Sequence, residues 1–266
     1  MNTLTDLADL SGRRALITGG AGHLGRVMAH TLAGMGADLV LVDLDSEKLE
    51  DTGEELNDRF PSKVRTFFCD LESEDERGDL AKTVLETGGI NILINNAAFV
   101  GTTELHGWAE PFEKQSLVAW RRAMEVNLTA AFHLSQLFAP SLKVNRGSSI
   151  INIGSIYGSI APDWSLYEGT DMANPAAYGV SKAGLVQLTK WLASALGPFV
   201  RVNSISLGGI ERGQPQEFID RYIKKTPLGR MACEGDIIGA IAFLSSDMSS
   251  YVTGHDLPAD GGWSIL

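Results

Sequence analysis

Tyr178 and Lys182 are separated by four positions in the segment AAYGVSKAGL. In a helix, residues at i and i+4 lie on one face, so the phenol and the ammonium are predicted to point into the same space. A neighbouring cation favours the phenolate, and we therefore expect the pKa of Tyr178 to be lowered. Such a tyrosine can exchange a proton with a carbonyl or an alcohol. The isolated pair also fits an ordinary surface helix, so its meaning depends on the elements that position it.

A glycine-rich turn follows the first predicted strand. The apolar segment 13–18 leads into Gly-Gly-Ala-Gly-His-Leu-Gly, and helical apolar spacing continues to residue 35. Glycines allow a tight turn and close approach of a pyrophosphate, whose charge the helix N-terminus favours. The pattern predicts a dinucleotide site, and the alternative is a plain glycine-rich strand-to-helix turn. The predicted contacts in this turn are Gly19, Gly22, His23, Leu24 and Gly25.

Asp43 ends the second predicted strand, 18 residues after Gly25. A carboxylate at this place accepts a hydrogen bond from the ribose 2′-OH and repels a 2′-phosphate. No Lys or Arg occurs at 19–25 or 39–45 to receive that phosphate. The sequence therefore favours NAD(H), with NADP(H) as the less favoured cofactor.

Further motifs follow in a fixed order. They are Cys69-Asp70-Leu71, Asn95-Asn96-Ala97-Ala98, Asn127, Ser155 at a predicted strand end, Tyr178 with Lys182, and Asp260-Gly261-Gly262-Trp263. Together with Thr18–Gly25 they make nearly the whole chain resemble the short-chain dehydrogenase/reductase family.

The resemblance implies a catalytic tetrad. Tyr178 would exchange the proton, Ser155 would align the substrate oxygen, and Asn127 would position a relay water. Lys182 would hold the ribose and lower the pKa of Tyr178. Beyond the glycine turn, the implied cofactor contacts are Asp43, Asp70, Leu71, Asn96, Ala97, Tyr178, Lys182, Gly208 and Ile210.

Three departures from the family pattern stand out. His23 replaces a glycine of the common motif, Leu207-Gly208 replaces Pro-Gly, and 22 residues separate Ser155 from Tyr178. The spacing of Gly19, Gly22 and Gly25 also resembles the sugar-nucleotide branch of the family, which carries an additional C-terminal region.

The long connection between Ser155 and Tyr178 contains aromatic and acidic side chains. We expect Asp163, Trp164 and Tyr167 to contact the substrate together with Ser155 and Tyr178, and Glu168 to lie near them. Aromatic faces and carboxylates suit a polyhydroxylated ligand, and a packing or subunit-contact loop is the alternative. The segment resembles members of the family linked to surface-sugar or flagellin-glycan synthesis. The whole chain resembles gluconate 5-dehydrogenase-like members.

These observations predict an oxidoreductase that interconverts a secondary alcohol and a ketone, on a sugar, polyol or related polar metabolite. Three alternatives remain open. They are a 3-oxoacyl-carrier reductase, a sugar-nucleotide epimerase or dehydratase, and a non-catalytic NAD sensor.

Composition limits the remaining classes. The 266 residues suit one domain, and 44% of them are hydrophobic, which supports a full core. The net charge of −11 argues against a nucleic-acid partner. Two cysteines and five histidines show no metal-ligand spacing, and no leader or membrane segment is apparent. We expect a cytoplasmic homo-oligomer, a dimer or a tetramer, that acts on a small molecule without metal, membrane or nucleic acid.

Alternating patterns predict the fold class. Strands are predicted at 13–18, 38–43, 63–69, 90–95, 148–154, 199–205 and 254–258. Helices are predicted at 23–35, 46–59, 74–87, 117–144, 175–196, 217–225 and 235–246. The alternation indicates an α/β, Rossmann-like, doubly wound parallel sheet of about seven strands with helices on both faces, in one domain over 1–266. Segments 156–174 and 206–230 are predicted substrate loops, the second a candidate lid.

Overall fold

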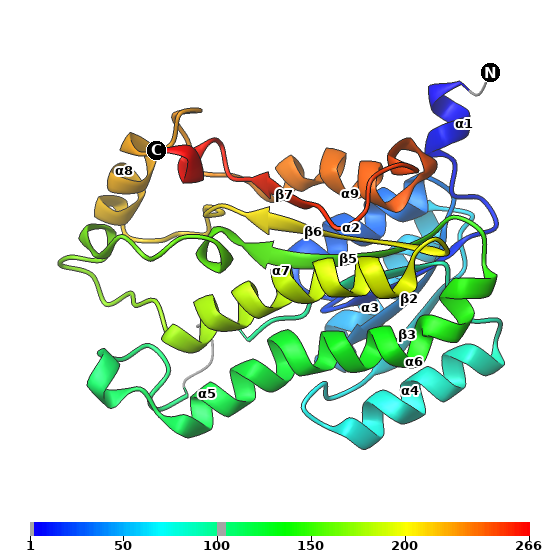
Figure 1. The fold of residues 1–266 in the computed structure, drawn as a ribbon, viewed down its shortest axis with the longest axis horizontal. Helices are drawn as coiled ribbons and strands as arrows, with labels where there is room; N and C mark the ends of the chain where they lie inside the picture. Colours follow the sequence, from blue (N-terminus) through cyan, green and yellow to red (C-terminus); the bar gives the residue numbers. More distant parts are fainter. Residues whose placement is uncertain (1–2, 100–104) are drawn as a thin grey trace.

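The computed structural model describes residues 3–99 and 105–266. One parallel sheet runs through it, with the strands in the order β3-β2-β1-β4-β5-β6-β7 (Figure 1). The strands are β1 Arg14–Thr18, β2 Asp38–Asp43, β3 Val64–Phe68, β4 Ile92–Asn95, β5 Ser148–Ser155, β6 Val200–Leu207 and β7 Asp256–Ala259. This sheet, with helices on both sides, confirms the predicted fold class.

Two sets of helices cover the sheet. The apolar cluster on one face takes residues from α2 His23–Gly34, α3 Ser46–Arg59 and α9 Ile238–Ser245. The cluster on the other face takes residues from α4 Glu74–Glu86, α6 Ala130–Val144 and α7 Ala176–Leu196. The remaining α-helices are α1 Leu4–Ala8, α5 Leu117–Met124 and α8 Gln216–Lys224.

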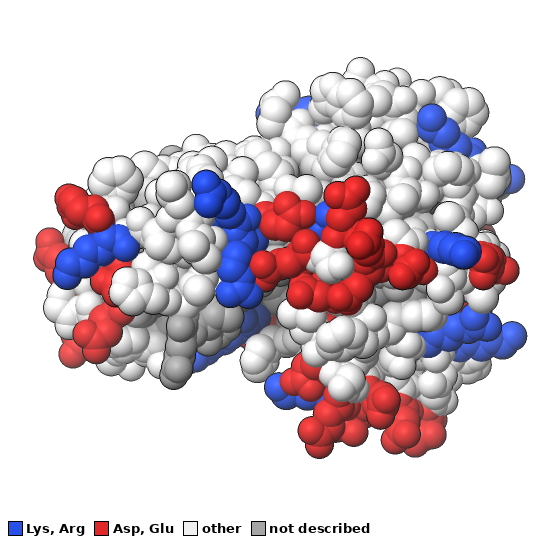
Figure 2. Space-filling view, turned by 90° about the horizontal axis from the view of Figure 1, so that it is seen from below, with Lys and Arg blue, Asp and Glu red and all other residues white. Residues whose placement is uncertain are grey.

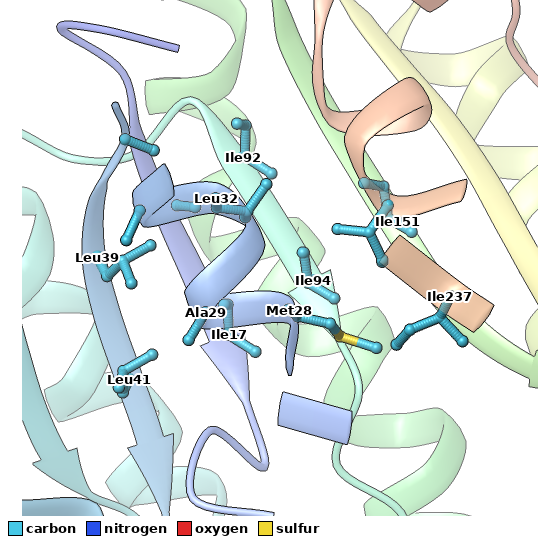
Figure 3. Packing of buried hydrophobic residues seen from close by; sticks show 14 of the residues in the cluster. Ile17, Met28, Ala29, Leu32, Leu39, Leu41, Ile92, Ile94, Ile151 and Ile237 are labelled. Atoms are coloured by element: carbon cyan, nitrogen blue, oxygen red, sulfur yellow. The ribbon is translucent and has the colours of Figure 1, made fainter. Parts of the chain in front are cut away.

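Strand residues alternate between the two apolar clusters. In β1, Ile17 joins the α2 side and Leu16 joins the α4 side, because successive side chains of a strand point to opposite faces. Figure 3 shows Met28 and Leu32 of α2 among Ile17, Ile94 and other strand residues. Both faces of the sheet are thus buried, which explains the continuous apolar runs of the strands.

The order in which the chain adds strands to the sheet changes sense next to β1. β2 pairs with one edge of β1 and β4 with the other, all in parallel. Ligands of such sheets bind beyond the carboxyl ends of the strands at this point. The carboxyl ends of β1, β2, β4 and β5 therefore lie at the same end of the sheet. The residues there are Thr18, Asp43, Asn95 and Ser155.

Three elements differ from the prediction. The helix expected over 235–246 is divided into the 3-10 helix η5 Glu234–Ile237 and α9. The helix expected over 117–144 is interrupted by a π-turn, η2 Glu125–Thr129, between α5 and α6. The short helix α1 was not predicted, although Thr3 and Asp6 form a reciprocal capping box at its start. The 3-10 helices are η1 Phe112–Lys114, η3 Ile156–Gly158, η4 Trp164–Leu166, η5 Glu234–Ile237, η6 Asp247–Ser249 and η7 Trp263–Ile265.

The surface reflects the negative net charge. Figure 2 shows acidic side chains gathered in the middle of the face seen from below, with basic side chains in separate groups around them. Among the described residues on this face there is no continuous basic surface of the kind that a nucleic-acid backbone requires. In the part of the chain that the structure describes, no helix combines the length and the apolar character needed to cross a bilayer.

Candidate active site

The glycine turn brings the start of α2 against the end of β1. Gly19 has φ of +66°, a conformation that favours glycine. A Cβ on Gly25 would lie 1.9 Å from the carbonyl oxygen of Gly19, so this position admits no side chain. Because α2 begins at His23, its first unpaired N–H groups face the cleft beyond the strand ends. The turn provides the close backbone approach and the positive helix end that a pyrophosphate needs.

Polar contacts between β1 and β4 fix this turn. The Thr18 hydroxyl accepts hydrogen bonds from the N–H groups of Asn96 at 3.0 Å and Ala97 at 3.1 Å. The Asn96 amide donates to the carbonyls of Thr18 at 2.9 Å and Gly19 at 3.2 Å. Asn96 and Ala97 therefore hold the glycine turn in place and also line the cleft.

Asp43 lies at the end of β2 beside the glycine turn. One carboxylate oxygen accepts from the Ala21 N–H at 2.9 Å, and the other accepts from the Leu44 N–H at 2.8 Å. The second oxygen also accepts from the Asp45 N–H at 3.4 Å, so the first oxygen is the one that can accept a further hydrogen bond. The carboxylate is thus fixed in the cleft with an acceptor that suits a ribose hydroxyl.

Ser155, Tyr178 and Lys182 converge on the same cleft. Ser155 ends β5 and is buried, and its hydroxyl accepts from the Tyr157 N–H at 3.3 Å. Tyr178 and Lys182 come from the first turns of α7, whose N-terminal half packs beside η3. The Lys182 ammonium donates to the Ile153 carbonyl at 2.7 Å and lies 5.9 Å from the centre of the Tyr178 ring. The i, i+4 relation predicted from the sequence is therefore present.

The protonation of this pair differs from our expectation. Burial raises the pKa of Tyr178, and a side-chain hydrogen bond from Ser155 only partly opposes the rise. Burial also lowers the pKa of Lys182 from 10.5 to about 8. The predicted lowering of the Tyr178 pKa is wrong for this structure, because desolvation outweighs the hydrogen bond from Ser155 and the charge of Arg212. The phenol therefore holds its proton at neutral pH, as a proton donor to a carbonyl must.

Asn127 does not line the cleft, but it bonds to segments beside it. It lies in the π-turn η2 and is buried. Its side-chain oxygen accepts from the Phe99 N–H at 2.6 Å, and its amide donates to the Ser181 hydroxyl at 3.0 Å. Asn127 thus ties the segment after β4 to α7, next to Lys182. π-turns often occur at functional sites.

The predicted cofactor residues share one cleft of about 770 Å³. Those that line it are Gly19, Gly22, His23, Leu24, Asp43, Asp70, Leu71, Asn96, Ala97, Tyr178, Lys182, Gly208 and Ile210. Gly25 is buried behind the turn. The glycine cradle, the helix end and the carboxylate acceptors together fit a nicotinamide dinucleotide.

The predicted substrate residues separate into two places. Tyr167 lines the cleft and its hydroxyl lies 2.8 Å from that of Tyr157. Asp163 instead caps η4 through the Ser165 N–H and pairs with Lys225. Trp164 is 61% exposed and lines a neighbouring cavity of about 840 Å³. The structure does not bring Asp163 or Trp164 together with Ser155, so their role in substrate binding remains a prediction.

Glu168 is not among the residues that line the cleft either. Its carbonyl accepts a hydrogen bond from Arg221, which joins the predicted loop 156–174 to α8. The Asp163 side chain therefore serves the structure of the loop, and Glu168 contributes its backbone carbonyl to the contact with α8.

Several lining residues were missed from the sequence. The substrate side of the cleft includes Tyr157, Met172, Phe218, Tyr222 and Met231, and its rim includes Arg122 and Arg212. The position of Tyr157, two residues after Ser155, was a usable signal. Met172, Arg212, Phe218 and Tyr222 lie in the segments 156–174 and 206–230 that were predicted as substrate loops, but which of their side chains reach the cleft depends on how these segments fold.

No group of three or more metal-ligating side chains gathers in a metal-binding arrangement within residues 3–99 and 105–266.

Comparison with known proteins agrees with this geometry. The family model described as enoyl-(acyl carrier protein) reductase matches residues 19–264. The chain is 30% identical to a 3-oxoacyl-(acyl-carrier-protein) reductase of Thermotoga maritima, over 96% of this chain and 99% of the other. It is 32% identical to a cyclohexanol dehydrogenase of Rhodococcus sp., over 97% and 98%.

A solved structure shares the fold along its whole length. It is a gluconate 5-dehydrogenase of Burkholderia cenocepacia in complex with NADP and tartrate, with a TM-score of 0.85 and 28% identity. The match covers 99% of this chain and all of the other.

Proposed function

The chain belongs to the short-chain dehydrogenase/reductase family and is an NAD(P)-dependent oxidoreductase of alcohols and ketones, and we propose that Ser155, Tyr178 and Lys182 perform its chemistry. The observation that carries the proposal is their convergence on the cleft that also contains the glycine turn. A nicotinamide held in this cleft would supply or accept the hydride. The protein residues must then orient the substrate and move one proton.

Tyr178 is the proposed proton donor in the reduction direction. Its phenol is held in the protonated form by burial, and it would donate to the substrate oxygen as the hydride reaches the carbonyl carbon. Ser155 would donate a hydrogen bond to the same oxygen and align it. Lys182 would place a positive charge next to the tyrosinate formed during the step, which lowers the cost of that charge.

NAD(H) is the proposed preferred cofactor. Asp43 is fixed by three backbone N–H groups at the end of β2, where its charge would repel a 2′-phosphate. Among proteins similar to this chain, a mannitol dehydrogenase of Alternaria alternata is NADP-dependent, so cofactor choice needs a direct measurement. Titrations of NADH and NADPH, followed by fluorescence, test the preference, and equal affinities would contradict it.

A polar secondary alcohol, such as a sugar or polyol, remains the proposed substrate class. Tyr157 and Tyr167 offer hydroxyls, and the similar gluconate 5-dehydrogenase supports it. A second candidate is a 3-oxoacyl thioester. It is favoured by the apolar and aromatic wall formed by Met172, Phe218 and Met231, and by the reductase of Thermotoga maritima.

We also propose that the protein is a cytoplasmic homo-oligomer. Large apolar side chains are exposed on the adjacent helices α5, α6 and α7, namely Leu117, Val118, Phe132, Val180 and Trp191. An apolar surface of this kind favours burial against a second copy. Light scattering at micromolar concentration is expected to give a dimer or tetramer, and a monomer would contradict the proposal.

Absorbance at the NADH band tests the chemistry, with sugars, polyols, nucleotide-sugars and oxoacyl thioesters as substrates. Tyr178→Phe is expected to lower turnover by about 100-fold or more, because it removes the acid, and to leave NADH binding nearly unchanged. Tyr251→Phe is the control, because Tyr251 is fully exposed and does not line the cleft. Turnover by Tyr178→Phe at the rate of the control would overturn the proposed role of Tyr178. NADH binding without turnover of any substrate would favour a sensor. Turnover of substrate without net change in NADH would favour an epimerase.

A further inference from the structure

Two arginines pair with the same short element, η5. The Nε of Arg212 lies 2.9 Å from Glu234, and Arg230 lies 2.6 Å from Asp236. Both arginines are exposed, and both are paired with a carboxylate of η5. Arg212 lines the cleft of Ser155 and Tyr178 and Arg230 does not. Arg230 also uses both terminal nitrogens on Asp236, whereas Arg212 uses its Nε on Glu234.

Arg212 lies near the start of α2. η5 packs against α2, and Figure 3 shows Ile237 of η5 near Met28 of α2. The hydrogen bond from Arg212 lowers the pKa of Glu234, and His23, the first residue of α2, adds to the same effect. The pair of Arg212 with Glu234 is therefore close to the end of α2 that faces the cleft.

The donors of Arg212 are only partly used. Glu234 accepts from Nε, and within the described chain the two terminal nitrogens of Arg212 have no protein partner. The other cations that line the cleft are already engaged. Arg122 donates from two nitrogens to Glu72, and Lys182 donates to the carbonyl of Ile153.

We propose that Arg212 binds the pyrophosphate of the dinucleotide through its terminal guanidinium nitrogens, while Glu234 holds its Nε. A planar guanidinium suits two phosphate oxygens, and its charge adds to that of the helix N-terminus in the same cleft. This inference rests on the proposed dinucleotide site. The motifs of the sequence do not indicate this function for Arg212. The residue lies about 190 positions after the glycine turn, so its place beside that turn depends on the fold.

Direct binding of NADH, followed by fluorescence, tests the proposal without turnover. Arg212→Ala is expected to raise the Kd for NADH about tenfold or more, since it removes charge-assisted hydrogen bonds. Arg212→Lys keeps the charge but lacks the planar guanidinium, so its Kd should lie between those of the wild type and Arg212→Ala. Arg230→Ala is the matched control and should bind NADH as the wild type does.

Smaller probes separate phosphate binding from a general disturbance of the cleft. Arg212→Ala should weaken binding of ADP, which carries the pyrophosphate, and should leave binding of adenosine unchanged in calorimetric titrations. Circular dichroism and the melting temperature check that each variant is folded. If Arg212→Ala is unfolded, Arg212→Lys provides the same comparison of ADP with adenosine.

The outcomes distinguish this inference from the proposed function. Equal Kd values of NADH for Arg212→Ala and Arg230→Ala would overturn the role of Arg212 and leave the dinucleotide site intact. An equal loss of ADP and adenosine binding would assign Arg212 a structural role and would also overturn the proposal. No binding of NADH by the wild type would overturn the dinucleotide site and this inference with it.

Discussion

The ammonium of Lys182 donates to the carbonyl oxygen of Ile153 at 2.7 Å while it lies 5.9 Å from the centre of the Tyr178 ring. A residue of α7 is thereby fixed to the carboxyl end of β5, where Ser155 lies two residues further on. The strand thus positions the charge and the hydroxyl together. The cost of this arrangement is the burial of a cation, which lowers the pKa of Lys182 to about 8.

Lys182 should make stability depend on pH. An unfolded chain keeps the pKa of this lysine near 10.5, so between about pH 8 and 10.5 the unfolded state binds more protons than the folded state. Below about pH 8 the buried lysine is charged, and its burial lowers the free energy of unfolding by the largest amount. Above that pH the folded protein loses this proton first, so the free energy of unfolding rises with pH. Between pH 7.5 and 9.5 the wild type should gain about 1–2 kcal/mol in unfolding free energy relative to Lys182→Met, measured with urea.

Lys190→Met is the control for that experiment, because Lys190 is exposed on the same helix. Its stability should follow the wild type across this pH range. Parallel curves for the wild type and Lys182→Met would contradict the prediction.

Gly25→Ala should damage the cofactor site. The added methyl would lie 1.9 Å from the Gly19 carbonyl oxygen, so α2 or the turn must move. We expect a Kd for NADH at least about tenfold higher and a loss of about 1–3 kcal/mol in stability. Gly78→Ala in α4 is the matched control, because a Cβ there meets no atom within 4 Å. This control should raise the free energy of unfolding by up to about 1 kcal/mol. If Gly25→Ala lowers neither stability nor NADH affinity, the close approach of Gly25 to the Gly19 carbonyl is refuted.

Asn127→Ala should weaken the link between the segment after β4 and α7. It leaves the buried Phe99 N–H without its acceptor and removes the donor to Ser181, whose hydroxyl still donates to the Tyr178 carbonyl. We expect a loss of about 2–3 kcal/mol in unfolding free energy, measured by urea denaturation. Asn57→Ala removes an exposed amide that bonds the backbone of Val64 and should cost less than about 1 kcal/mol. A similar cost for both variants would contradict a structural role of the buried amide.

Asp43→Ala should shift cofactor selectivity. The change removes the charge that would repel a 2′-phosphate and also an acceptor for the ribose hydroxyl. The ratio of NADPH to NADH affinity should rise about tenfold or more in fluorescence titrations. Asp45→Ala, two residues away, is the control, because Asp45 caps α3 and does not line the cleft. An unchanged ratio in Asp43→Ala would exclude Asp43 as the selectivity residue.

Much of the fold was predictable because its signals are local. Each predicted strand begins and ends within two residues of the observed one. The central strands β1, β2, β4, β5 and β6 are buried on both faces and therefore give apolar runs. The π-turn at Asn127 was not predictable. One extra residue in a helical turn changes the hydrogen bonding without clearly changing the apolar period of 117–144.

More of the predicted cofactor residues than of the predicted substrate residues line the cleft. The residues at 19–25, Asp43 and Asn96 follow strand ends whose positions the topology fixes. The substrate wall depends instead on how α8 and the segment 156–174 fold over the cleft. Side-chain type alone suggested Asp163 and Trp164, but Asp163 is used as a cap and Trp164 faces another cavity.

The glycine turn also offers a practical site for a reporter. The side chain at position 23 is exposed at the mouth of the cleft, whereas position 25 has no room for a side chain. A histidine can therefore occupy position 23, where the common motif has glycine. A cysteine placed at position 23 would carry a fluorescent label beside the cleft, although the native Cys233 is also exposed and would first have to be replaced. Such a label would give a signal for occupancy of the cleft before any substrate is known.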